Sequence, residues 1–196
     1  MFNEPFGLQQ ATFDGTKTMT RRAVPEKTLE KWYDIEEDYM MAAPMGVPCY
    51  LEPMEDFLIR HAPYKVGEIV AIAQRYSQII SAITPRFAPH AKDWMRSEKG
   101  WNNKMFVKAE YMPHHIKITG IKVDGLAGIS DEDCLKEGIQ VLKGGFRNQD
   151  AYTFKGDKVW FKTPYLAYKE LIDRLNKRGH FESNPLVYAY TYELID

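Results

Sequence analysis

Apolar residues recur in this chain with two periods, one typical of helices and one typical of strands. Leu29, Trp32 and Tyr33 have helical spacing, while Ser130 and Gly138 are the kinds of residue that begin and end a short helix. Helical spacing of apolar residues, together with residues that begin or end a helix, predicts helices over residues 5–15, 26–39, 54–60, 131–137 and 164–178.

Strands are predicted where β-branched and aromatic residues alternate between turn residues. These segments are 17–24, 69–76, 105–109, 114–123 and 186–195. One of them changes phase, because Ile116 and Ile118 share one face whereas Ile121 and Val123 share the other. Gly120 lies at the change, and a glycine at such a slip predicts a β-bulge that bends the strand.

The order of these elements predicts an α+β protein with a small curved sheet or barrel and flanking helices. Short strands are separated by helices and irregular loops, without the regular strand–helix rhythm of a doubly wound parallel sheet. Residues 1–196 are expected to form one domain, decorated by irregular insertions near 26–60 and 80–103.

Composition narrows the class of protein. The chain has 196 residues, 44% of them hydrophobic, and a net charge of −1, so any nucleic-acid binding requires a local basic patch. Cys49 and Cys134 have no companion metal-binding pattern, which favours free thiols. The chain lacks a membrane-spanning run and a signal-peptide pattern, and we expect a cytoplasmic protein with neither a metal nor a cofactor.

The most distinctive segment is the octapeptide 15–22, Gly-Thr-Lys-Thr-Met-Thr-Arg-Arg. As a strand it has two faces, one with Lys17, Met19 and Arg21 and the other with Thr18, Thr20 and Arg22. Cations and hydroxyls together suit a phosphate, a carboxylate or the polar edge of a base. The alternative is a solvated edge strand whose charges prevent aggregation.

Several landmarks resemble the ASCH domain family, a branch of the PUA-like β-barrels, and especially its longer phage and prophage members. The octapeptide is followed in order by Val66-Gly67-Glu68, Met112-Pro113, an Ile-Ser-acidic-acidic segment at 129–132 and Asn184-Pro185. The match excludes roughly 26–60 and 80–103. The resemblance implies a PUA-like barrel whose cleft is lined by the Lys-Thr-Arg strand. It also implies binding of RNA or a modified nucleoside or nucleotide.

Small bacterial members of that family are amidohydrolases that act on N4-acetylated cytidine with a Lys, a Thr and a Glu. Carried over by position, these residues are Lys17, Thr20 and Gln74. A glutamine accepts no proton near neutral pH, so binding is favoured over hydrolysis, and a protein-interaction module is the third alternative. Lys17 and Gln74 are expected to lie on neighbouring strands or strand ends and to face one concave pocket.

Three more residues complete the predicted ligand-binding set. Arg75 flanks Gln74, and Trp94 and Trp101 lie among cations in the second insertion. Exposed tryptophans beside cations are suited to stacking on bases. The alternative is that both tryptophans anchor a long loop to the core.

Overall fold

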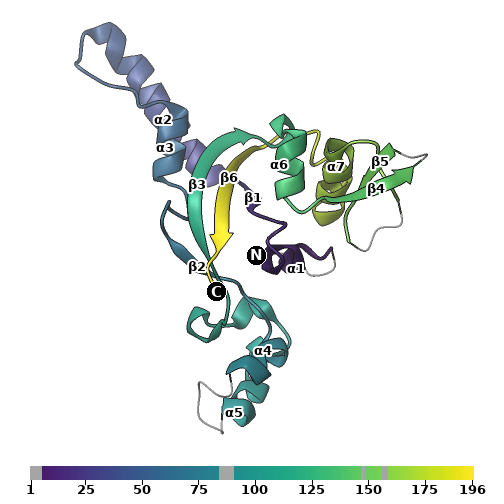
Figure 1. The fold of residues 1–196 in the computed structure, drawn as a ribbon. Coiled ribbons are helices and arrows are strands. Elements are labelled where there is room, and N and C mark those ends of the chain that lie inside the picture. Colours follow the sequence, from purple (N-terminus) through teal and green to yellow (C-terminus); the bar gives the residue numbers. More distant parts are fainter. Residues whose placement is uncertain (1–5, 84–90, 147–148, 156–158) are drawn as a thin grey trace.

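The computed structural model describes residues 6–83, 91–146, 149–155 and 159–196. Its central element is a curled antiparallel sheet with the strand order β1-β6-β3-β2 (Figure 1). The strands are β1 (Met19–Ala23), β2 (Ile69–Ala71), β3 (His115–Gly125) and β6 (Leu186–Leu194). The sheet curls into a half-barrel, and the α+β class with a small curved sheet and flanking helices is therefore confirmed.

The curl coincides with the predicted bulge in β3. The pairing of β3 with β6 shifts register between Ile118 and Gly120, as the change of phase predicted. A Cβ atom added at Gly120 would lie 2.6 Å from Oγ1 of Thr191 on the neighbouring strand, so no larger residue fits without movement. Because a bulge increases local twist, it lets the long strand bend with the sheet.

Helices surround the sheet on several sides, and a hairpin extends from one edge of the molecule (Figure 1). The helices are α1 (Leu8–Phe13), α2 (Glu26–Ala42), α3 (Met54–Arg60), α4 (Tyr76–Ile83), α5 (Ala91–Ser97), α6 (Asp131–Lys136) and α7 (Pro164–Leu175). The hairpin consists of β4 (Gln140–Phe146) and β5 (Gln149–Thr153). This hairpin is not among the elements predicted from the sequence.

Two predicted strands and one segment predicted to be irregular differ from the structure. The strand expected over 105–109 is instead a 3-10 turn, Lys104–Phe106, because the Asn103 side chain accepts a hydrogen bond from the Met105 N–H. The strand expected over 69–76 ends at Ala71, and Tyr76 begins α4. The second insertion is not irregular throughout, since its described part contains α5 and short 3-10 turns.

The buried residues form two clusters. The larger cluster lies between the sheet and helices α1, α3 and α7, and it includes the three tyrosines of β6. The smaller cluster consists of Tyr76, Ile79, Met95 and Met112. It holds together α4, α5 and the turns that follow, and we call residues 76–83 and 91–111 the aromatic lobe.

Candidate ligand-binding site

The predicted basic residue Lys17 is buried rather than exposed. Its side chain is 2% exposed, and its ammonium donates hydrogen bonds to the carbonyls of Met19 at 2.7 Å and Glu137 at 2.8 Å. The third contact is an ion pair with the Glu137 carboxylate, also at 2.7 Å. All three ammonium protons therefore have acceptors, as a buried charge requires.

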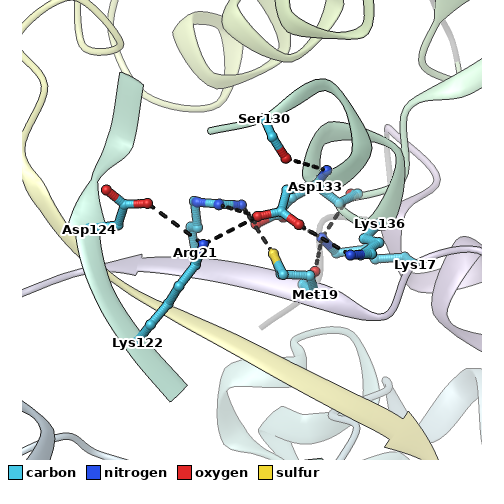
Figure 2. Close-up of polar contacts among 9 residues, drawn as sticks. Lys17, Met19, Arg21, Lys122, Asp124, Ser130, Asp133 and Lys136 are labelled. Carbon is cyan, nitrogen blue, oxygen red and sulfur yellow. Dashed lines mark hydrogen bonds and ion pairs between the residues drawn. The ribbon is translucent and has the colours of Figure 1, made fainter. Parts of the chain in front are cut away.

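Arg21 extends the same network on the same face of β1. Its guanidinium donates to Asp133 at 3.1 Å and lies 3.4 Å from the Glu137 carboxylate (Figure 2). Lys122 and Lys136 also pair with Asp133, at 3.4 and 3.3 Å. The Arg21 side chain is 1% exposed, yet its Nε has no hydrogen-bond acceptor among the described residues.

The network shifts the titration of its members. Burial lowers the pKa of Lys17 from its usual value, while the charge and hydrogen bond of Glu137 oppose that change. Partial burial acts to raise the pKa of Asp133, but hydrogen bonds from Arg21 and Lys136 and the nearby positive charges outweigh it. The pKa of Asp133 is therefore held below its usual value.

The residues that begin and end α6 determine where the carboxylates of Asp133 and Glu137 lie. The Ser130 hydroxyl caps α6 by accepting the Asp133 N–H at 3.1 Å, which fixes Asp133 in the first turn of the helix. Gly138 takes a φ of 104°, which ends the helix directly after Glu137. The Thr18 N–H then donates to the Lys136 carbonyl at 2.9 Å, and this bond ties the end of α6 to the start of β1.

Lys17, Arg21 and Glu137 border a cavity of about 320 Å³ between β1 and α7. Thr20 and Arg22 also line it, so the predicted residues Lys17, Thr20, Arg21 and Arg22 all border one space. The side chains that α7 contributes to the cavity wall are mostly apolar, and those that follow α7 in the chain are polar. They include Tyr168, Leu171, Ile172, Leu175, Asn176 and His180.

Thr20 and Arg22 border a second cavity as well, of about 150 Å³. Tyr64, Tyr190 and residues 70–73 supply much of its wall. The two cavities therefore share these two side chains of β1, which is an edge strand of the described sheet. A ligand at this edge can therefore contact Thr20 and Arg22 from either cavity.

Gln74 does not line the larger cavity, which Lys17 borders. It follows β2, which is not a hydrogen-bonded neighbour of β1 in the sheet, although residues 70–73 share the smaller cavity with Thr20 and Arg22. The Gln74 N–H donates to the sulfur of Met112, and its buried Oε1 has no hydrogen-bond partner among the described residues. The Arg75 N–H donates to Gln78, which places Arg75 at the start of α4.

The remaining predicted residues have structural contacts. The Thr18 carbonyl accepts the Tyr192 N–H within the β1–β6 pairing region. Trp94 and Trp101 lie in the aromatic lobe, where Trp94 packs edge-on against Tyr111 and Trp101 packs against the small core cluster. Neither tryptophan lines the two cavities beside β1.

Glu137 and Asp133 are site residues that were not predicted from the sequence. Both belong to an acidic helix that its cap made predictable, but their partners lie more than a hundred positions earlier in the chain. The one available signal was the surplus of cations in 17–22, which requires carboxylates if the segment is buried.

The described residues contain no group of three or more His, Cys, Asp or Glu side chains arranged to hold a metal ion. Within the same residues, no helix combines the length and apolar character needed to cross a membrane. Comparison with known proteins adds no relative, since no family model, curated protein or solved structure matches the chain.

Proposed function

We propose that this protein binds RNA or a modified nucleoside or nucleotide at the edge strand β1. The observation that carries the proposal is the shared cavity of Lys17, Thr20, Arg21 and Arg22. Its volume of about 320 Å³ lies within the usual range for small-molecule sites. The resemblance of 15–22 and the later landmarks to the ASCH family supports the same ligand class.

The walls of the cavity suit the two halves of a nucleotide. Leu171, Ile172 and Leu175 offer an apolar surface for a base or sugar, while Thr20 and Arg22 offer a hydroxyl and a cation for phosphate. The buried Nε of Arg21 needs an acceptor, and a ligand oxygen would satisfy it.

The cations at the cavity have different roles in this proposal. Lys17 and Arg21 are paired with carboxylates, so they shape the site and contribute little net positive charge. Arg22 lines both cavities beside β1 and supplies a cation for the phosphate group. Lys177 and Arg178 are exposed beside the cavity residues Asn176 and His180, and they extend the positive surface outward.

An amide-cleaving enzyme is the second candidate, because Lys17, Thr20 and Glu137 line one cavity. Glu137 would supply the carboxylate that Gln74 lacks. Two features rank this candidate lower. The ammonium of Lys17 already has three acceptors, and no carboxylate among the described residues hydrogen-bonds to the Thr20 hydroxyl. A general base must come within hydrogen-bond reach of the nucleophile.

Binding is tested with fluorescein-labelled single-stranded RNA and, by calorimetry, with cytidine monophosphate. We expect Arg22→Ala to weaken both interactions, and RNA affinity to fall as salt rises because phosphate contacts release counterions. Lys117→Ala removes an exposed cation that lines neither cavity beside β1, and it is the matched control. Equal affinities for wild type and Arg22→Ala would contradict the proposal.

The enzymatic alternative is tested with N4-acetylcytidine by chromatographic detection of released acetate and cytidine. Under the binding proposal the wild-type protein gives no turnover. Turnover that disappears in Thr20→Val but persists in Gln74→Ala would favour the amidohydrolase, with its carboxylate at Glu137. Turnover created only by Gln74→Glu would instead place the family's carboxylate at position 74.

A further inference from the structure

The first insertion forms a projecting arm that the proposed ligand site does not use. The arm comprises residues 26–60, and its helices α2 and α3 extend away from the sheet (Figure 1). Trp32, Phe57 and Leu58 bury its base against the main core. The distal part carries large exposed apolar side chains, namely Tyr33, Ile35, Met40, Met41, Met45, Val47 and Tyr50.

Two side chains of the distal part of the arm are almost fully exposed. Met45 is 78% exposed and Tyr50 is 80% exposed. Contiguous exposed apolar side chains mark interaction surfaces, and methionines adapt their shape to a partner because their side chains are flexible. The arm therefore has the properties of a docking surface.

Charge limits what that surface can bind. Residues 26–60 contain nine carboxylates and three cations, a net charge of −6, whereas the whole chain carries −1. The rest of the chain is therefore positive. An arm-to-arm contact between two copies would bring two strongly negative surfaces together, which costs free energy. The complementary partner is cationic and also exposes apolar side chains.

The aromatic lobe of this chain has both properties. Met105 and Phe106 are 67% and 55% exposed, and Trp94 is 39% exposed. Lys99 lies 5.7 Å from the Phe106 ring centre, and Lys108 lies 5.9 Å from that of Trp94. These contacts place positive charge beside apolar surface without neutralising it.

A second cation-rich stretch, 139–181, fits the arm less well. Carboxylates already pair with three of its cations, in Lys143–Asp150, Lys169–Glu182 and Arg174–Glu170. In the lobe, the corresponding contact of Lys108 with Glu110 is long, at 3.9 Å, and both side chains are 63% exposed. In the lobe the cations Lys99 and Lys108 lie over the exposed rings of Phe106 and Trp94, whereas Arg174 in the stretch lies over the buried ring of Phe154.

We propose that the acidic arm of one copy docks on the aromatic lobe of a second copy, so that the protein associates head to tail. The arm and the lobe lie at opposite ends of the molecule (Figure 1), so one copy cannot satisfy both surfaces by itself. Such a contact joins two different surfaces and leads to a ring or a chain of copies. This proposal is independent of the ligand site at β1.

The test is a charge exchange followed by sedimentation velocity over a range of protein concentrations. Asp34→Lys, Glu37→Lys and Asp38→Lys together reverse one exposed face of the arm. Lys99→Glu, Lys104→Glu and Lys108→Glu reverse the lobe. We expect either triple variant to associate at least on the order of tenfold more weakly than wild type, because like charges then face each other. An equimolar mixture of the two should associate again.

The control triple variant is Lys143→Glu, Lys155→Glu and Lys162→Glu, which makes the same charge change in the stretch 139–181 and should leave association unchanged. Association of wild type should also weaken between 0.1 M and 1 M salt, since the screening length falls from about 10 Å to about 3 Å. A wild-type monomer at all concentrations overturns the proposal. Loss of association in the control, or no recovery in the mixture, also overturns it.

Discussion

Lys17 illustrates how far residue types alone can predict a site. The octapeptide showed where cations and hydroxyls gather, and four of its residues do border one cavity. Which of those cations pair with carboxylates inside the protein was not predictable. Lys17 and Arg21 pair with carboxylates that lie 112 to 120 positions away, and that choice depends on how α6 packs against β1. Arg22 is the candidate for contact with an anionic ligand because it lines both cavities beside β1.

The buried ion pair predicts a large effect of removing one partner. Lys17→Met leaves the carboxylate of Glu137 buried with a single, longer contact to Arg21, at 3.4 Å. We expect the free energy of unfolding in urea to fall by about 3 to 5 kcal/mol, as for other broken buried pairs. The double variant with Glu137→Leu removes both charges and should recover part of that loss. A fall below about 1 kcal/mol would show that the pair is not effectively buried.

Asp133 predicts a loss of stability in acid. Its pKa is lower in the folded protein than its usual value of 3.8, so the unfolded chain takes up the proton first. The stabilisation is present above that value and is lost as pH falls through the folded pKa. Asp133→Asn should therefore flatten the dependence of unfolding free energy on pH below about 4, measured by urea titrations at several pH values. Asp56→Asn, on the exposed face of the arm, is the control.

At the scale of elements, prediction succeeded where a local signal was sufficient. The caps at Ser130 and Thr163 begin α6 and α7 as expected, and the phase change located the bulge. The aromatic lobe was missed because its order depends on contacts between elements. The apolar run at 69–76 is typical of a strand, but Tyr76 and Ile79 are spaced so that a helix buries both against Met95 and Met112.

The two caps allow a matched comparison. Ser130→Ala and Thr163→Ala should each lower the free energy of unfolding by about 1 kcal/mol, since each hydroxyl accepts an N–H at the start of its helix. Only Ser130→Ala should also weaken ligand binding, because α6 holds Asp133 and Glu137 against β1. Urea unfolding of each variant and of the wild type measures the change in stability, and fluorescence anisotropy of labelled RNA measures the change in affinity. Equal effects of both variants on RNA affinity would contradict this link.

At the scale of the whole molecule, the charge is separated although the total is close to zero. The net charge of −1 excluded a generally basic protein, and it concealed an arm with −6. Its acidity is visible in the sequence. That the arm projects from the body is not visible in the sequence. The helical spacing of Leu29, Trp32 and Tyr33 does not reveal how few of the apolar residues on this helix are buried. Of these three side chains only Trp32 is buried.

The position of β1 in the sheet also constrains how the protein is made. Its strand neighbour is β6, and Thr20 pairs with Tyr190, so some 170 residues must leave the ribosome before β1 can form its ladder. Until then β1 is an unpaired strand in a growing chain, the state in which edge strands join other chains. Arg21 and Arg22 would discourage such pairing during synthesis. The charges that shape the finished site thus also protect the strand before its partner exists.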